Sequence, residues 1–458
     1  MSHYKPYPAY KDSGVEWLGR VPEHWGIQRI RSLIDSAQNG IWGDDPDGGA
    51  DDIPCARVAD FDRNSFTVKG ELPTLRKVPE AQRLSRQVNS GDLLIEKSGG
   101  GEQTTVGVVV QYQGAEPVIC SNFVAVVKPK QGVSARWLCY TNAHLYSVGV
   151  NFRSIKQTTG IQNIDSDQYF SERVAVPPER ERQIISAHLD RETARIDALV
   201  AKKTRFIELL REKRQALITH AVTKGLDPSV KMKDSGVEWL GEVPEHWETM
   251  SLTRVTVARC DGPFGSAIKS ENYTDSGVRV IRLQNIGIGE FKDGDQAFLS
   301  PEYRAEVIGH SHDVEPGDLL IAGLGDENNP LGRTCVAPSS LGDAIVKADC
   351  YRFRTDRNRA LPAFLALQLS ATARVECGFI STGSTRERLN LGLAASRVIA
   401  LPPSTDEQSA IVERAARATA RLDDLLSKTE HSIELLKERR SALITAAVTG
   451  QIDLREHH

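Results

Sequence analysis

The sequence predicts an α+β protein with two mixed α/β domains joined by two long antiparallel coiled-coil helices, arranged as a pseudo-twofold internal repeat. The first observation is a duplicated opening: KDSGVEWLGRVPEHW at 11–25 returns as KDSGVEWLGEVPEHW at 233–247. The second is a duplicated ending, because ELLREKRQALITHAVTKGLD at 208–227 returns as ELLKERRSALITAAVTGQID at 434–453. The third is a long charge-rich stretch without glycine or proline in each copy. Together these observations indicate one structural unit written twice.

The segments between the shared ends, 26–175 and 248–400, align only at scattered points, such as GDLLI at 91–95 and at 317–321. Short β-branched runs predict strands at 105–110, 124–127 and 278–283. Apolar side chains at three- and four-residue spacing predict helices over 135–148 and 361–375. Because the frame repeats while its contents differ, the variable segments are expected to hold two different specificities.

Long helices are predicted over 181–222 and 407–448, after the steps Pro177-Pro178 and Pro402-Pro403. Each would reach roughly 60 Å at 1.5 Å per residue. Apolar residues alternate at spacings of four and three, so each helix is expected to cover the stripe of the other in an antiparallel pair. The predicted segments are a domain at 1–178, a helix at 179–226, a domain at 227–403 and a helix at 404–453. The predicted helix-pair core is Ile185, Leu189, Ile196, Leu199, Phe206, Leu210, Leu217, Ile411, Leu422, Leu425, Leu436 and Leu443.

Bulk properties favour a cytoplasmic protein without disulfides. Seven cysteines are widely spaced and lack a C-x-x-C pair, which is typical of reduced thiols. The N-terminus has no signal-peptide pattern, and no apolar run approaches the ~20 residues that span a bilayer. The net charge of −4 supplies no general attraction to nucleic acid, so any DNA contact must come from local basic clusters or from a partner.

No catalytic or metal-binding residue is predicted. The Pro-Pro steps lack the flanking residues of an amino-methyltransferase loop, and the glycines at 99–101 lack the Lys-Ser/Thr of a phosphate loop. Asp92, Glu96 and Lys97 have the wrong spacing for a nuclease, and the other copy has Ala322 and Gly323 instead. His310 and His312 have no further ligand nearby. The four tryptophans of the duplicated opening are interpreted as core anchors.

Polar and basic loops in the variable segments are the candidate DNA-binding regions. Arg and Asn or Gln side chains match base edges in the major groove, while Lys, Ser and Thr hold phosphates. In the first half the candidates are Lys97, Ser98, Gln103, Thr104, Arg153, Lys156, Gln157 and Thr158. In the second half they are Phe264, Ser266, Lys269, Arg282, Gln284, Asn285, Thr382, Ser384, Arg386 and Arg388.

The order of these motifs, given twice, resembles the specificity subunits (HsdS) of type I restriction-modification systems over nearly the whole chain. The motifs are the KDSGVEWLG-x-VPEHW openings, the GDLLI strands, DGPFGSAIK at 261–269 and the ALIT-x-AVT helix ends. The resemblance implies two target recognition domains, each reading half of an asymmetric, interrupted DNA site. It also implies two methyltransferase subunits (HsdM) that methylate adenine, with restriction subunits (HsdR) for cleavage. S-adenosylmethionine, ATP and Mg²⁺ would be bound by those partners and not by this chain.

Two other classes of function stay open. A duplicated coiled-coil adaptor would assemble proteins without touching DNA, and a self-contained nuclease would cleave DNA with a metal and no partner. If the helices set the gap between the half-sites, inserting one turn of about 5.4 Å into both should change the gap by one or two base pairs at ~3.4 Å each.

Overall fold

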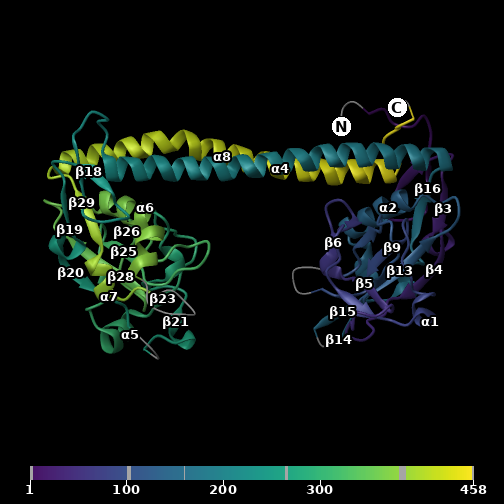
Figure 1. The fold of residues 1–458 in the computed structure, drawn as a ribbon, viewed down its shortest axis with the longest axis horizontal. Coiled ribbons are helices and arrows are strands. Elements are labelled where there is room, and N and C mark those ends of the chain that lie inside the picture. The colour runs from purple at the N-terminus through teal and green to yellow at the C-terminus, as the bar shows by residue number, and fades with distance from the viewer. Residues whose placement is uncertain (1–3, 101–104, 159, 264–266, 381–387, 456–458) are drawn as a thin grey trace. The chain divides into compact units, whose positions relative to one another are not determined.

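The computed structural model describes residues 4–100, 105–158, 160–263, 267–380 and 388–455. The chain forms two compact units: unit 1 is Met1–Arg205 with Glu430–His458, and unit 2 is Phe206–Thr429. Each unit holds one variable segment and part of each long helix, α4 (Glu179–Lys224) and α8 (Thr405–Val448) (Figure 1). The predicted α+β class is confirmed. The two units do not coincide with the four predicted segments, because each unit contains one variable domain together with part of both long helices.

The main sheet of unit 1 has six strands in the order β4-β13-β9-β11-β7-β6. In its centre, β9 carries Leu93 and Ile95 into a core with α2 and both long helices, while Leu94 enters a second core on the other face. This alternation is the period-two pattern of a strand covered on both faces. The elements are β1 (Tyr10–Asp12), β2 (Arg20–Pro22), β3 (Gly26–Arg29), β4 (Ile34–Asn39), β5 (Asp52–Ala56), β6 (Phe61–Asp62), β7 (Thr67–Val68), β8 (Leu75–Lys77), α1 (Glu80–Arg83), β9 (Leu93–Glu96), β10 (Ser98–Gly99), β11 (Val109–Gln111), β12 (Ile119–Cys120), β13 (Val124–Pro129), α2 (Ala135–Ser147), β14 (Ile155–Thr158), β15 (Ile161–Ile164), α3 (Ser166–Tyr169) and β16 (Arg173–Val176).

Unit 2 repeats this topology. Its sheet β20-β28-β25-β26 matches β4-β13-β9-β11, and its parallel pair β22–β27 matches β5–β12. Strand β25 again sends alternate residues into two cores, Leu319 and Ile321 into one and Leu320 into the other. The elements are β17 (Met232–Asp234), β18 (Glu242–Pro244), β19 (Glu248–Ser251), β20 (Thr256–Cys260), β21 (Tyr273–Thr274), β22 (Val278–Ile281), β23 (Phe298–Leu299), α5 (Pro301–Tyr303), β24 (Asp313–Val314), β25 (Leu319–Ala322), β26 (Thr334–Val336), β27 (Ala344–Val346), β28 (Cys350–Thr355), α6 (Pro362–Ile380), α7 (Leu391–Ser396) and β29 (Val398–Leu401).

The duplicated opening anchors the first turn of each long helix. In unit 1, Trp25 Nε1 donates to Glu181 at 2.9 Å, and His24 Nε2 lies 2.7 Å from the same carboxylate. In unit 2, Trp247 Nε1 donates to Glu407 at 2.9 Å, with His246 Nε2 beside it. Both tryptophans are fully buried. The other two tryptophans of the motif, Trp17 and Trp239, are partly buried against the same cores, so the prediction of core anchors is confirmed most fully for Trp25 and Trp247.

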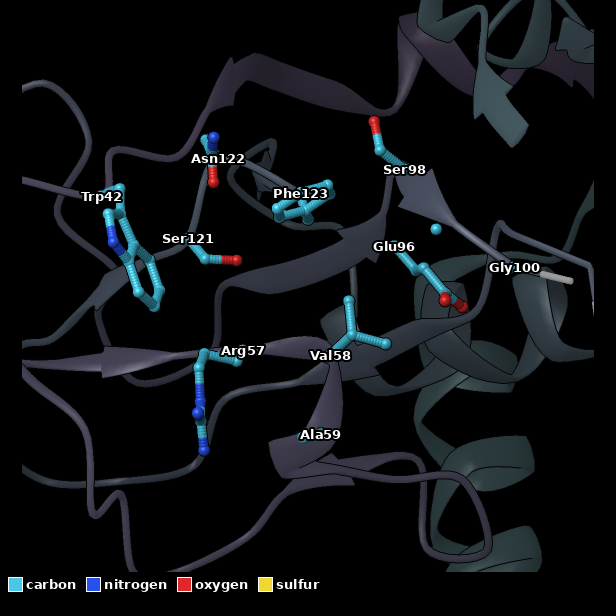
Figure 2. Close-up of a pocket in the computed structure, with 11 residues that line it drawn as sticks. Trp42, Arg57, Val58, Ala59, Glu96, Ser98, Gly100, Ser121, Asn122 and Phe123 are labelled. Carbon is cyan, nitrogen blue, oxygen red and sulfur yellow. The ribbon is translucent and has the colours of Figure 1, made fainter. Parts of the chain in front are cut away.

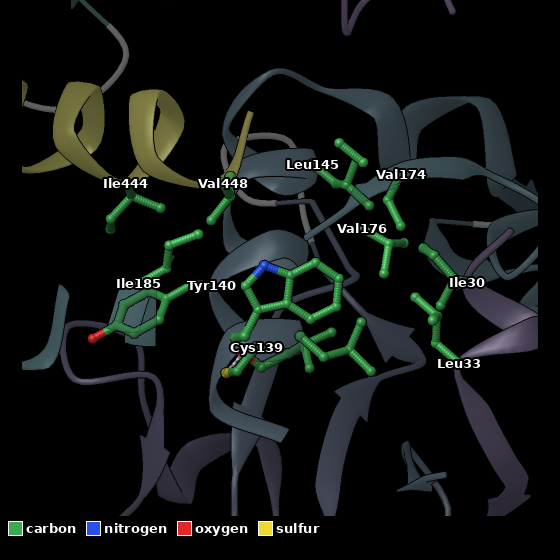
Figure 3. Packing of buried hydrophobic residues seen from close by; sticks show 14 of the residues in the cluster. Ile30, Leu33, Cys139, Tyr140, Leu145, Val174, Val176, Ile185, Ile444 and Val448 are labelled. Atoms are coloured by element: carbon green, nitrogen blue, oxygen red, sulfur yellow. Dashed lines mark hydrogen bonds between the residues drawn. The ribbon is translucent and has the colours of Figure 1, made fainter. Parts of the chain in front are cut away.

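Both helix segments join the core of the unit that they cross. Figure 3 shows Ile185 of α4 with Ile444 and Val448 of α8 among the buried side chains of unit 1. The segments are antiparallel, since Asp197 pairs with Arg440 at 3.0 Å in unit 1 and Arg214 pairs with Asp423 at 2.7 Å in unit 2. These ion pairs are the same pair at duplicated positions.

The buried seam of the helices repeats every eleven residues. Ile185, Ile196, Ile207 and Ile218 are buried on α4, and Ile411, Leu422 and Ile444 follow the same spacing on α8. An eleven-residue repeat advances 3.67 residues per turn, so a seven-residue pattern drifts off the seam within a few turns. The predicted core positions Leu199, Phe206 and Leu217 are therefore wrong: their side chains are 41%, 44% and 37% exposed.

The other predicted core positions are covered to different degrees. Leu425 and Leu436 are partly buried. The remaining predicted positions are buried: Ile185, Leu189, Ile196, Leu210, Ile411, Leu422 and Leu443.

No described helix combines the length and apolar character needed to cross a membrane.

Candidate nucleic-acid interface

Each copy places a glycine-flanked aromatic residue after its first long strand. The sequence NGIWG at 39–43 in unit 1 corresponds to DGPFG at 261–265 in unit 2. A Cβ on Gly40 would lie 2.2 Å from the Cys120 oxygen, and one on Gly262 would lie 2.1 Å from the Lys347 carbonyl carbon. Only glycine fits against backbone at that distance, so Gly40 and Gly262 make the same close approach to the backbone in the two units. The predicted Phe264 lies outside the described residues, and its counterpart Trp42 was missed by sequence reasoning.

Trp42 lines a cavity of about 500 Å³ on the surface of unit 1. Figure 2 shows Trp42 and Phe123 at this cavity together with Arg57, Ser98, Asn122 and Glu96. The two aromatic side chains are 38% and 47% exposed. Aromatic faces beside guanidinium, amide and hydroxyl groups are the chemistry that contacts bases and phosphates.

Glu96 forms the buried acidic wall of this cavity. Its side chain is 3% exposed, and Arg63 Nη2 lies 3.0 Å from its carboxylate. Burial raises the pKa of Glu96, while Arg63 acts in the opposite direction. The carboxylate is thus an ion-pair partner within the domain, and the loose nuclease-like set of Asp92, Glu96 and Lys97 has a structural explanation.

The predicted residues of the first half gather around strand β15. Ser98 Oγ donates to Asn163 Oδ1 at 2.5 Å, and β10 pairs with β15, which pairs with β14. Ser98 therefore lies in the same three-stranded sheet as the exposed Lys156 and Gln157 of β14, with β15 between them. Lys97 Nζ donates to Asn39 Oδ1 at 2.9 Å. Arg153 lies 3.8 Å from Glu16, and Lys156 lies 2.7 Å from Asp165. Gln103, Thr104 and the side chain of Thr158 lie outside the described residues.

Arg57 and Arg282 occupy the same turn in the two units. The Arg57 backbone N–H donates to Asp60 at 2.8 Å, and that of Arg282 donates to Asn285 at 2.9 Å. The prediction included Arg282 and missed Arg57. Aligning RVAD at 57–60 with RLQN at 282–285, each after a buried strand, would have supplied the signal.

Several predicted residues of the second half are engaged within unit 2. Arg282 and Gln284 both donate to Asp295. Asn285 is fully buried, and its amide donates to the carbonyls of Lys292 and Asp295 at 3.0 and 2.8 Å. The expectation that Asn285 reaches a base edge is therefore wrong, because the hairpin turn uses its whole side chain.

Tyr273 lies between two cations of unit 2. Lys347 Nζ donates to its hydroxyl at 2.9 Å, and the Arg282 guanidinium lies 5.8 Å from its ring centroid. Among the predicted residues, Arg388 pairs with Asp349 at 2.8 Å, and Lys269 lies 3.9 Å from Glu271. Ser266, Thr382, Ser384 and Arg386 lie outside the described residues.

Asp261 belongs to the aromatic motif of unit 2. Its carboxylate accepts from the backbone N–H of Gly262 at 2.7 Å and of Asp349 at 3.2 Å. Burial raises the pKa of Asp261 to about 6.

Across the part of the chain that the structure describes, no group of three His, Cys, Asp or Glu side chains is placed to hold a metal ion. All seven cysteines are free thiols.

The chain is similar over nearly its full length to curated specificity subunits of type I restriction enzymes. It is 22% identical to the MjaVIII subunit of Methanocaldococcus jannaschii over 445 residues, which cover 95% of both chains. It is 21% identical to the EcoKI subunit of Escherichia coli and to the StySPI subunit of Salmonella potsdam, covering 95% of this chain and 90% of each relative. No protein-family model matches the chain.

A solved structure supports the fold. A chain from a structural study of complex assembly and conformational transition of the type I R-M system superposes with a TM-score of 0.69 at 14% identity, covering 94% of this chain and 99% of the other. These similarities confirm the resemblance that the repeated motifs indicate.

Proposed function

We propose that this chain, a member of the type I restriction-modification specificity subunits, is the non-catalytic subunit that selects the DNA sequence. Each variable domain reads one half of a bipartite, asymmetric site. The observation that carries this proposal is that both units share the same scaffold but present different polar and aromatic side chains. Unit 1 offers the Trp42, Arg57 and Phe123 surface, whereas unit 2 offers Tyr273 with Arg282 and Lys347.

The partners follow from the family. Double-stranded DNA is the target, and two methyltransferase subunits (HsdM) dock on this chain to methylate adenine. Two restriction subunits (HsdR) join where the system also cleaves DNA. S-adenosylmethionine, ATP and Mg²⁺ belong to those subunits. The net charge of −4 fits a chain whose partners complete the DNA-binding surface.

The test is single-molecule methylome sequencing of a host that expresses this chain with its cognate methyltransferase. We expect one interrupted motif, methylated on adenine in both half-sites. Replacing Trp42 with Ala should weaken or relax only one half of the motif. Absence of any motif, or a continuous motif, would contradict the proposal.

The alternative is a coiled-coil adaptor that never touches DNA. Such a chain would co-purify with proteins but leave the methylome of the host unchanged. A second experiment inserts one helical turn into both α4 and α8. We expect the gap in the motif to change by one or two base pairs at ~3.4 Å each, and an unchanged gap would exclude the helices as the ruler.

A further inference from the structure

An open groove lies along the long helices in unit 2, outside the candidate base-reading surfaces. Its volume is about 1240 Å³, and it is lined by one face of α4, by α8, by the hairpin after β22 and by α6. Five cations line it: Arg211, Arg214, Lys224, Lys292 and Arg374. Three carboxylates also line it: Glu212, Glu290 and Asp423.

The positive charges of this groove exceed the negative ones. Five cations and three carboxylates line it, and Arg214 pairs with Asp423 at 2.7 Å. Lys224 and Arg374 donate to backbone carbonyls, of Glu242 and Glu327, so these contacts do not neutralise their charge. Lys292 is exposed, and none of the described residues forms an ion pair with it. A basic groove is unexpected in a chain with a net charge of −4.

The hairpin that lines the groove is shorter than its counterpart in unit 1. In unit 1 the hairpin closes with Lys69 N–H to Asp60 O at 2.9 Å and encloses residues 61–68. In unit 2 it closes with Lys292 N–H to Asn285 O at 2.8 Å and encloses residues 286–291, two fewer. The longer hairpin covers Arg440, which donates to Asn64 O and lies 5.0 Å from the Phe66 ring centroid. At the duplicated position, Arg214 faces the open groove.

We propose that this groove binds the phosphate backbone of the DNA beside the half-site read by unit 2. Lys292 and Arg374 are the principal contacts. Ammonium and guanidinium groups on a helix-lined groove bind phosphates without reading bases, because phosphate contacts position the protein and carry no sequence information. This inference rests on the proposed function and adds a sequence-independent contact to it.

The test uses the assembled methyltransferase complex and measures its affinity for a duplex that holds its motif, at several salt concentrations. Each lost phosphate contact should reduce the magnitude of the negative slope of log K against log salt by about 0.9, and should lower the affinity at 0.15 M salt about fivefold. We expect this for Lys292→Gln and for Arg374→Gln, with the same loss on DNA without the motif. Lys213→Gln is the control, since Lys213 is an exposed cation of α4, one of the helices at the groove, but does not itself line the groove.

The outcomes separate this inference from the proposed function. If the wild-type complex neither binds nor methylates an interrupted motif, the proposed function fails. If the wild-type complex does so but both groove variants keep its salt slope, only the groove inference is overturned. A changed base preference in the methylome of a groove variant would also overturn it, because a phosphate contact cannot alter the motif.

Discussion

The two units use the same frame but cover the long helices differently. In unit 1, Arg440 is 14% exposed, because the hairpin with Asn64 and Phe66 lies over it. In unit 2, Arg214 is 31% exposed beside the groove. Phe66 adopts a left-handed conformation, with φ of 55°, which costs a non-glycine residue free energy. The duplicated arginine position is therefore covered by the longer hairpin in unit 1 and is more exposed beside the shorter hairpin in unit 2.

The contacts that hold the last part of each variable domain to the domain helix differ more sharply. In unit 2, Glu376 of α6 pairs at 2.7 Å with Arg397, the residue before β29, and both side chains are fully buried. In unit 1, Tyr169 of α3 donates to Asn142 Oδ1 of α2 at 2.7 Å. The domain helix thus makes a buried charged contact in unit 2, whereas this contact of α2 in unit 1 is neutral.

The largest expected effect is the loss of this buried ion pair. Glu376→Gln keeps the shape of the side chain but leaves the Arg397 charge buried without a counter-ion, so unit 2 should lose about 3–5 kcal/mol of stability. The comparison variant in unit 1, Tyr169→Phe, should cost about 1–3 kcal/mol, because it leaves only a neutral acceptor unpaired. Hydrogen exchange resolved by peptide measures each unit separately. Equal losses would show that the buried charge has no special role.

The two units also differ in how their stability is expected to depend on pH. His144 of α2 is buried, and its Nδ1 lies 3.0 Å from Thr445 Oγ1 of α8. Burial lowers the pKa of His144 to about 4 from 6.5. Helix α6 of unit 2 contains no histidine.

The unfolded chain binds the proton of His144 more readily than the folded chain, so folding stability falls as pH drops. The loss begins near pH 6.5, is complete near pH 4 and amounts to at most about 3 kcal/mol, at ~1.4 kcal/mol per pKa unit. Hydrogen exchange between pH 7 and 4 should show it in unit 1. His144→Gln keeps a polar group near Thr445 and removes the titration. If unit 1 of that variant is still as acid-sensitive as the wild type, His144 is not the cause.

The frame could be predicted from the sequence because its signals are duplicated or long. The opening motif, the GDLLI strands and two helices of more than forty residues leave little freedom of interpretation. Leu199, Phe206 and Leu217 were wrongly predicted to be buried. The prediction used a heptad period of 3.5 residues per turn, whereas the buried residues follow 3.67 residues per turn, and the two periods select the same positions over two turns but diverge later.

The candidate site was predicted less completely. Trp42 and Arg57 became visible only when the halves were aligned through glycines that touch backbone and through a shared turn. Asn285 looked like a base reader because its amide suits adenine, but a side chain that caps a turn has the same sequence signature. The hairpin at the groove is two residues shorter than its counterpart, a difference that can be recognised only after the flanking turns are aligned.

The smallest expected effect concerns the duplicated ion pairs of the helices. Arg440→Met should cost about 2 kcal/mol, because it removes a largely buried guanidinium from Asp197, from the Asn64 carbonyl and from the Phe66 ring. Arg214→Met should cost about 0–1 kcal/mol, since its pair with Asp423 is nearer to solvent. Double-mutant cycles with Asp197→Asn and Asp423→Asn isolate each pair. Raising the salt concentration should weaken the coupling in unit 2 more than that in unit 1, because exposed charges are screened more. Equal couplings with equal salt dependence would mean that the hairpin does not shield Arg440, and the contrast between the two units would then lie in the groove alone.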